Sequence, residues 1–499
     1  MAGRADRAAI EAAIVNLIRL ACAVMVVGAI SWTTVDPDLW GHLLSGRDVL
    51  VDGGLPERDA YSFTSDRPII DHEWLGQVLL FVAYKFGGSV GLVALKTAVV
   101  VAAVGLMVMA LRRSSLKSAH RDALILAAIV TILPRFHPAR PQVFSLLLFA
   151  LLLYVLVAVD RGERTKLVAL PLLTAAWANL HGGFLVGLAV LGLWTAIRTY
   201  QETDPLRRIA LVGTAVAAIV VTALNPYGIG LWRFLWSTVG VQRPGISDWQ
   251  PLYLLSPVTI IPFVIFVTVL VIAVAFARRR VDWLYVVIVG ILGVAAVRVS
   301  RIDAFFAIAA IMLLGPSLGA AAQTLSTPRQ SALPKAFRLS VAMVAGVVLV
   351  TGLSLVTKGA SCIEILSGPE AESIEFFEQN GLRGRVLTFF DWGLQAAWHL
   401  APGVQVSMDG RRETVYSDEL VAAHVRLYRN ETNSMSLVDK LNPDFIWLPS
   451  GGDNIATLQN AGWNSIFVGP TSTILSRERR SPTIVKATAD HPSRCFPDR

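Results

Sequence analysis

The chain has 499 residues, of which 54% are hydrophobic and only 16% are charged, and its mean hydropathy is +0.57. Soluble globular chains carry about 25% charged residues, so this composition excludes a large water-soluble enzyme and a disordered protein. Three cysteines in the whole chain exclude a scaffold built on disulfides. The net charge of +8 does not indicate a nucleic-acid partner, because basic cytoplasmic loops give membrane proteins the same excess. We predict a polytopic membrane protein.

Apolar segments long enough to cross a bilayer recur along the first two thirds of the chain. A helix needs roughly 20 apolar residues to span about 30 Å of hydrocarbon. We expect about eleven spans, at residues 17–34, 90–111, 123–133, 143–159, 167–180, 184–197, 209–224, 259–277, 283–297, 304–318 and 339–356. The third and fifth are short, so the exact number of spans stays open.

Lysine and arginine collect in alternate loops between these segments. The basic loops include Arg112, Lys117, Arg161, Arg198, Arg278 to Arg280 and Arg329. The positive-inside rule places these loops in the cytoplasm, with the N-terminus inside and everything after residue 356 outside. We therefore expect a multi-pass protein of an inner (plasma) membrane.

The composition changes after Lys358. Residues 385–390, 404–408 and 444–448 resemble short strands, and residues 394–400, 418–429 and 454–461 are helical in pattern. This alternation predicts a small extracytoplasmic α/β domain at residues 358–499, following a helical transmembrane domain at residues 1–357. Cys362 and Cys495 bracket the α/β domain, either as a disulfide or as two free thiols.

The first predicted outer loop, residues 36–73, carries acidic groups at both of its membrane-proximal ends. It opens with Asp36-Pro37-Asp38 and closes with Asp71-His72-Glu73. In one interpretation these residues only start interfacial helices. In the other they form a catalytic pocket, where a carboxylate takes a proton or where Asp36, Asp38 and Glu73 hold Mg²⁺ or Mn²⁺. The stiffness of Pro37 predicts that its two neighbouring carboxylates point in different directions.

The second predicted outer loop is basic and rich in proline. Its sequence Pro134-Arg135-Phe136-His137-Pro138-Ala139-Arg140-Pro141 places Arg135, His137 and Arg140 within eight residues. Guanidinium groups pair with phosphate in a bidentate manner, so this loop suits an anionic lipid-linked substrate. The alternative is that the arginines only reach out to lipid head groups.

Further polar residues follow in the later outer loops. His181 precedes Gly182-Gly183, where a tight bend either turns the imidazole into a cavity or is an ordinary turn. Arg298 and Arg301, with Asp303, form either a second phosphate clamp or a local ion pair.

Two motifs stand out in the C-terminal domain, Phe389-Phe390-Asp391-Trp392-Gly393 and Met408-Asp409-Gly410-Arg411-Arg412. Asp391 either caps the helix that is predicted to begin at Leu394 or contacts an acceptor. His399, Asp409 and Arg411 are candidates for lining a substrate groove.

In these features the chain is similar to the GT-C class of integral-membrane glycosyltransferases, the superfamily of oligosaccharyltransferases and protein mannosyltransferases. The resemblance rests on the acidic first outer loop, on the many-span body with a C-terminal outer domain, and on the aromatic-Asp-aromatic-Gly motif at Asp391. It covers most of the chain in layout but only short motifs in residues. The chain also resembles a largely uncharacterised bacterial branch of this class.

The resemblance implies inverting transfer of a sugar from a polyprenyl-phosphate-linked donor to a glycan, lipid or protein acceptor of the cell envelope. Asp36 or Asp38 would be the base, and Arg135, Arg140, Arg298 or Arg301 would neutralise the leaving phosphate. The second outer loop lacks the acid that metal-dependent relatives carry, so dependence on a metal stays open. The alternatives are a metal-free polysaccharide polymerase or ligase, a transporter of a lipid-linked saccharide, and a non-catalytic scaffold.

Overall fold

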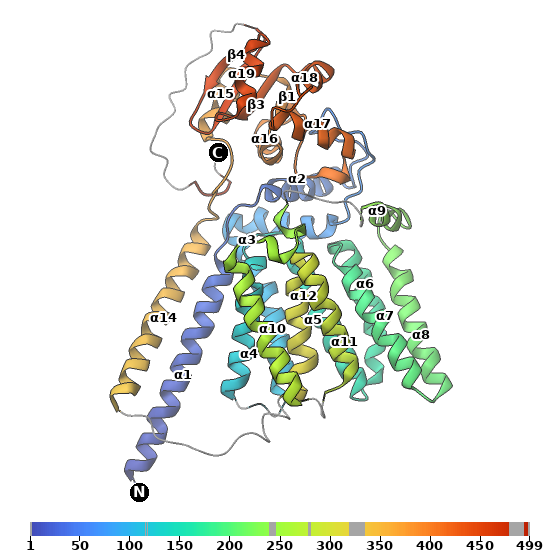
Figure 1. Cartoon of the computed structure of the whole chain (residues 1–499), viewed down its shortest axis with the longest axis vertical. Helices are drawn as coiled ribbons and strands as arrows, with labels where there is room; N and C mark the ends of the chain where they lie inside the picture. The colour runs from blue at the N-terminus through green and yellow to red at the C-terminus, as the bar shows by residue number, and fades with distance from the viewer. Residues whose placement is uncertain are drawn as a thin grey trace. The chain divides into compact units, whose positions relative to one another are not determined.

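The computed structural model describes residues 2–114, 116, 118–238, 246–277, 281–318, 335–478 and 494–497 (Figure 1). Of the basic loop residues, Lys117, Arg278 to Arg280 and Arg329 lie outside this description. The chain forms two compact units. The helical unit comprises Met1–Thr33, Leu92–His137 and Pro141–Ser361, and the α/β unit comprises Thr34–Gly91, Pro138–Arg140 and Cys362–Arg499. The first predicted outer loop thus forms one unit with the C-terminal residues.

Each of the predicted spans lies on a helix. These helices are α1 (Ala2–Ser31), the second part of α3 (Trp74–Arg112), α4 (Ser118–Ile132), α5 (Gln142–Asp160), α6 (Ala169–Leu180), α7 (Phe184–Gln201), α8 (Pro205–Val220), α10 (Pro257–Ala277), α11 (Trp283–Arg298), α12 (Asp303–Ala309) with its π-helical extension Ala310–Leu314, and α14 (Lys335–Ser361). Within the described ranges, eight segments are long and apolar enough to cross a membrane. The shorter helices are α4, α6 and α11. The structure therefore bears out a polytopic helical membrane protein.

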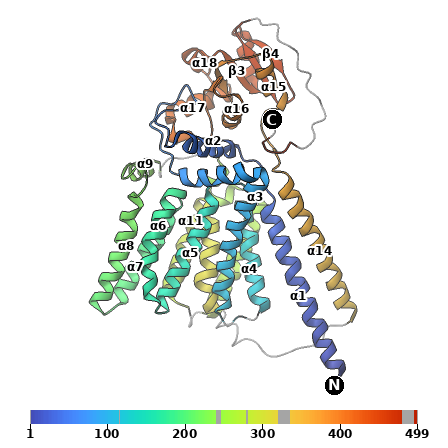
Figure 2. The ribbon, with the colours of Figure 1, turned by 180° about the vertical axis from the view of Figure 1, so that it is seen from behind.

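Helices α1 and α14 run side by side in both views (Figures 1 and 2). A Cβ atom on Gly28 would lie 2.6 Å from the carbonyl oxygen of Gly352, and a Cβ on Gly352 would lie 2.7 Å from the backbone nitrogen of Met25. Small residues at such crossings let two membrane helices approach closely, because packing rather than the hydrophobic effect drives their association. The glycines thus fix this pair.

Two ion clusters mark the opposite ends of the helical unit. At one end, Nη2 of Arg198 lies 2.8 Å from Asp160 at the end of α5 and 2.5 Å from Asp282, which caps the start of α11. At the other end of α11, Arg135 pairs with Asp303 at the start of α12. The ends of α5 and α7 and the start of α11 therefore lie at the same end of the helical unit.

Helix α3 breaks at Gly88, whose φ of 56° and ψ of −144° lie outside the helical region. A residue with a side chain adopts a positive φ only at a cost, so glycine suits this position. The segment from Trp74 to Gly91 belongs to the α/β unit, and the helical unit resumes at Leu92.

The α/β unit is built on a five-stranded mixed sheet of order β2-β1-β3-β5-β4. Its strands are β1 (Gly384–Thr388), β2 (Val404–Val406), β3 (Phe445–Pro449), β4 (Asn464–Val468) and β5 (Ser472–Ser476). Strand β1 pairs in parallel with β2 and β3, whereas β5 is antiparallel to β3 and β4. The first three strands match the predicted segments, and β4 and β5 were not predicted.

Helices cover both faces of this sheet. They are α15 (Ala371–Gln379) and α16 (Gly393–Leu400) on one face, and α17 (Asp418–Tyr428), α18 (Met435–Leu441) and α19 (Asp453–Asn460) on the other. Alternate residues of each strand point to opposite faces, so Val386 packs with α15 and α16 while Leu387 packs with the second group. The two apolar layers explain why the C-terminal residues form an α/β fold.

The first predicted outer loop extends the sheet at its β2 edge. The backbone nitrogen of Val406 donates to the carbonyl oxygen of Tyr61 at 2.8 Å, and that of Phe63 donates to the carbonyl oxygen of Val406 at 3.2 Å. These bonds form an isolated parallel bridge between Ser62 and Val406, which covers part of an otherwise open edge. A disulfide joins Cys362 to Cys495, the pair that the sequence singled out.

Candidate active site

Asp36 and Asp38 lie at the start of α2 (Pro37–Asp52) in the α/β unit. Asp36 is the N-cap residue, and its Oδ1 accepts a hydrogen bond of 3.0 Å from the backbone nitrogen of Asp38. Pro37 occupies the first helical position, where its missing N–H costs nothing. Asp36 thus starts this helix, as one of the two interpretations of the loop expects.

Both carboxylates contact the same guanidinium. Nη2 of Arg140 donates to Oδ2 of Asp36 and lies 3.2 Å from Oδ2 of Asp38. The prediction that Pro37 turns its neighbours in different directions is therefore wrong. Asp36 and Asp38 both lie in the first turn of α2, where both side chains can reach a group beyond the N-terminal end of the helix. Arg140 bridges them as a shared counter-ion.

The two acids differ in their environment. Burial raises the pKa of Asp38 to about 7, Arg140 opposes this rise, and the charges of Asp36, Glu73 and Asp391 reinforce it. The Asp38 side chain is nevertheless 35% exposed, compared with 17% for Asp36. Asp38 is therefore a carboxyl group that solvent can reach and that titrates near neutral pH.

His42 lies one helical turn after Asp38 on α2. Burial, and to a smaller extent the charges of Arg140 and His72, lower its pKa to about 3. The imidazole is consequently neutral at physiological pH. Sequence reasoning missed His42, although its spacing of four residues from Asp38 puts both on one face of a helix.

The closing end of the first outer loop joins the same cluster. Nε2 of His72 lies 3.5 Å from Oε1 of Glu73, and Oδ1 of Asp71 accepts a hydrogen bond of 3.2 Å from the Glu73 backbone nitrogen. Burial raises the pKa of Asp71 to about 6. The structure thus brings the two acidic ends of this loop together.

Asp391 faces this cluster from the C-terminal part of the unit. It lies in a 3₁₀ turn, Phe390–Trp392, and is exposed. Partial desolvation and then the charge of Asp36 raise its pKa. No side chain caps the start of α16, so the capping interpretation of Asp391 is not supported.

Asp409 and Arg411 form a buried ionic network. Nη2 of Arg411 lies 2.6 Å from Asp409 and 2.8 Å from Asp59 of the first outer loop, and the Tyr416 hydroxyl donates to Asp409 at 2.8 Å. Burial alone would lower the pKa of Arg411, but Asp409, Tyr416 and Asp59 outweigh it and raise the pKa well above its usual value. This arginine fastens the loop to the C-terminal domain and is not available to line a groove. His399 packs against the Trp40 ring.

Other predicted residues lie in the helical unit and have separate partners. Arg135 donates through Nε and Nη2 to Asp303 and through Nη1 to Asp248. The sequence left open a local ion pair of Asp303 with Arg298 or Arg301, but in the structure Asp303 pairs with Arg135. Arg301 stacks over the Trp249 ring at 4.7 Å, and Arg298 is exposed.

His181 and His137 have interior contacts in the helical unit. Nδ1 of His181 accepts from the Gly183 backbone nitrogen at 2.9 Å and lies 2.7 Å from the Ser145 hydroxyl. His137 stacks on Trp32 at 5.0 Å. Both contacts are typical of packing inside the helical unit.

Lys96 is a buried charge that sequence reasoning missed. Its Nζ contacts the carbonyl oxygens of Trp32 and His137 at 3.2 and 3.1 Å and the Thr33 hydroxyl at 2.5 Å. A single lysine inside an apolar span is itself a signal, because ionisable groups in spans are kept for function or for fixed contacts. Here three acceptors match its three donors.

Within the described ranges, no group of three or more His, Cys, Asp and Glu side chains could hold a metal ion.

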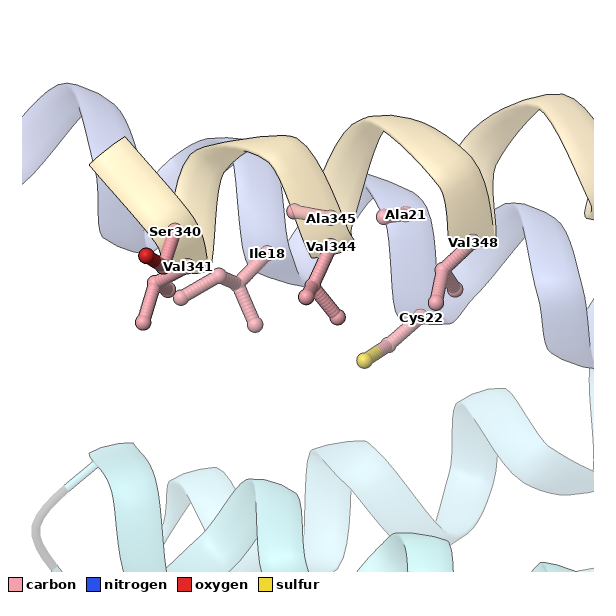
Figure 3. Close-up of a pocket in the computed structure, with 8 residues that line it drawn as sticks. All are labelled: Ile18, Ala21, Cys22, Ser340, Val341, Val344, Ala345 and Val348. Atoms are coloured by element: carbon pink, nitrogen blue, oxygen red, sulfur yellow. The ribbon is translucent and has the colours of Figure 1, made fainter. Parts of the chain in front are cut away.

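A separate groove of about 390 Å³ lies on the helical unit (Figure 3). Residues of α1 and α14 line it, namely Ile18, Ala21, Cys22, Ser340, Val341, Val344, Ala345 and Val348. None of the candidate site residues is among them, and the lining suits hydrocarbon rather than a reacting group.

No known protein-family profile matches the sequence, and no curated protein matches it. Solved structures of membrane glycosyltransferases share its fold. ArnT from Cupriavidus metallidurans bound to undecaprenyl phosphate has a TM-score of 0.52 at 12% identity, covering 95% of this chain and 99% of ArnT. Apo ArnT gives 0.51 at 14% identity, covering 94% and 98%. The arabinofuranosyltransferase AftD from Mycobacteria gives 0.50 at 14% identity, covering 93% of this chain but only 40% of AftD. The chain therefore has the fold of GT-C glycosyltransferases, as the sequence predicts.

Proposed function

We propose that the protein transfers a sugar, with inversion, from a polyprenyl-phosphate-linked donor to a glycan, lipid or protein acceptor of the cell envelope, and that Asp38 is the base. The observation that carries this proposal is the pair of carboxylates at the start of α2 sharing Arg140. The GT-C fold and the undecaprenyl phosphate bound to ArnT support the choice of donor.

Asp38 suits the role of base better than Asp36. Oδ1 of Asp36 is engaged as the helix cap and its Oδ2 is paired with Arg140, so its two oxygens already have fixed partners. Asp38 is more exposed, and a pKa of about 7 matches the pH at which a general base works best. Asp36 then acts as a positioning residue for α2 and Arg140.

In the proposed step, Asp38 accepts a proton and Arg140 stabilises the negative charge that forms on the phosphate. Asp38 takes the proton from the acceptor hydroxyl or amide as that group bonds to the anomeric carbon. The bond from the anomeric carbon to the phosphate oxygen breaks, and its electron pair stays on the lipid phosphate. Arg140 meets the new negative charge. A positioned base contributes about 10²–10⁴-fold to such a reaction.

We place this reaction at the outer face of an inner (plasma) membrane, with the N-terminus in the cytoplasm. The excess of lysine and arginine in the opposite loops supports this orientation. A donor on a lipid carrier also suits a site outside the cytoplasm, where nucleotide-sugars are absent.

Release of free lipid phosphate tests the proposal. Purified protein in nanodiscs would be offered a panel of polyprenyl-phosphate sugars, with and without Mg²⁺ or Mn²⁺. We expect turnover by the intact protein, loss of at least 100-fold in Asp38→Asn, and a smaller loss in Asp36→Asn. Saturable lipid binding without turnover on any donor, retained by both variants, would instead favour a transporter or scaffold.

A further inference from the structure

Gly410 lies directly against the carboxylate of Asp38. A Cβ atom at position 410 would lie less than 3.0 Å from Oδ1 of Asp38 and 3.2 Å from Cδ1 of Leu394. Real Cβ atoms essentially never approach an oxygen so closely. The space that a side chain would fill at this position is occupied by the Asp38 carboxylate.

The backbone gives no other reason for glycine at this position. Gly410 is not among the glycines with a positive φ, so a residue with a side chain can adopt its conformation. Space, and not conformational freedom, is what the glycine provides.

The segment that carries Gly410 cannot move away from Asp38. The next residue, Arg411, is held by Asp409 and Asp59 at 2.6 and 2.8 Å. The segment also lies against the start of α16, because a Cβ on Gly393 would lie 2.7 Å from Cβ of Asp409. Buried ion pairs and close backbone packing thus hold Gly410 in place beside Asp38.

Movement of helix α2 away from Gly410 would break its packing against α16. A Cβ on Gly41 would lie 2.8 Å from Cδ1 of Leu394, so the helix already packs closely on the same leucine. Trp40 of α2 is buried, and its ring lies 5.9 Å from that of Trp398. An atom added at position 410 must therefore displace the Asp38 side chain.

We propose that Gly410 is a positioning residue for Asp38: its missing side chain is the seat that holds the carboxylate in the reactive orientation. This inference rests on the proposed function, in which Asp38 is the base. It makes the segment Met408 to Arg412 part of the catalytic site.

Gly410→Ala should displace the carboxylate towards the partner of its other oxygen, which is Arg140 at 3.2 Å. The charges that face Asp38 are Arg140 and the acids Asp36, Glu73 and Asp391. Closer approach to Arg140 favours the ionised form of Asp38. The acid limb of the pH–rate profile should therefore move to lower pH, which a merely structural residue would not cause.

The test compares Gly410→Ala with Gly451→Ala, a matched control with no atom within 4 Å of its Cβ position. A displacement of about 1 Å at a reacting group can cost 10²-fold in rate. We expect Gly410→Ala to lower kcat about 100-fold while donor KM and binding of a prenyl phosphate stay within twofold. Gly451→Ala should match the wild type. A wild-type kcat and pH profile in Gly410→Ala would overturn the proposal.

A double variant keeps the test decisive if Gly410→Ala unfolds. Asp38→Ala removes the carboxylate that the new methyl group would strike. If Gly410 acts only by leaving room for Asp38, the double variant should have the same Tm and the same residual rate as Asp38→Ala alone. If Gly410→Ala is as damaging there as in the wild type, Gly410 serves the fold alone and the proposal fails.

Carboxyl labelling separates this inference from the proposed function. If the wild type releases no lipid phosphate from any donor, the proposed function fails and the seat remains testable. Carbodiimide coupling at pH 6 modifies protonated carboxyl groups, and Asp391 serves as the internal reference. We expect Gly410→Ala to slow modification of Asp38 several-fold relative to Asp391. An unchanged ratio would refute the seat.

Discussion

Arg140→Gln removes the guanidinium that Asp36 and Asp38 share, and its effect can be estimated from the structure. Two unit charges 3.2 Å apart, the separation of Nη2 from Oδ2 of Asp38, interact by about 5 kcal/mol at an effective dielectric constant of about 20. The side chains of Asp38 and Arg140 are 35% and 24% exposed, so solvent screening reduces this to about 1–2 kcal/mol. One pKa unit corresponds to about 1.4 kcal/mol. Loss of Arg140 should thus raise the pKa of Asp38 from about 7 by about one unit.

The predicted consequence is a displaced pH–rate profile. A base works in its deprotonated form, so a higher pKa moves the acid limb of kcat/KM to higher pH by about one unit. The measurement is release of lipid phosphate between pH 5.5 and 9.5. Arg140→Lys is the control, because it keeps the charge and should leave the limb in place. An Arg140→Gln enzyme that stays active with the wild-type limb would refute this account of the pair.

Three further predictions concern stability, measured by thermal unfolding of the purified protein. The folded-state pKa of Asp38 lies above its ordinary value of 3.8, so the protonated form favours the folded state and this contribution to stability is lost as the pH rises through about 7. Asp38→Asn should therefore raise Tm at pH 8 but not at pH 4. Asp36→Ala should cost about 1 kcal/mol through loss of the N-cap, whereas Asp36→Asn should keep most of it. Arg411→Ala leaves buried carboxylates unpaired and should cost about 3–5 kcal/mol, far more than the same change at exposed Arg298.

The helical architecture could be predicted because membrane spans are a local property of the sequence. Every backbone polar group in hydrocarbon must bond within its own helix, so length and hydropathy alone locate the spans. Strands β1 to β3 were predicted because each carries apolar or β-branched residues, continuously in β3 and as Val404 and Val406 on either side of Gln405 in β2. Strands β4 and β5 were missed because serine, threonine and asparagine make up much of them, and only their pairing with β3 identifies them.

The candidate site was predictable in its acids but not in its partners. Asp36 and Asp38 stand out because carboxylates beside a span are costly. Nothing local distinguishes Arg140 from Arg135, five residues away, yet one joins the acidic pair and the other is bound by Asp303 and Asp248. The choice depends on contacts between segments more than a hundred residues apart. The close contact between Gly410 and Asp38 likewise has no signal in the local sequence, because it joins two segments far apart in the chain.

The configuration of the product tests the central claim most directly. A polyprenyl-phosphate sugar that the purified protein accepts would be transferred in a single turnover, and the anomeric configuration of the new bond would be read by NMR. Direct attack with Asp38 as base predicts inversion, with one free lipid phosphate per bond formed and transfer at least 100-fold slower in Asp38→Asn. Retention of configuration, or unchanged transfer by Asp38→Asn, would contradict the account.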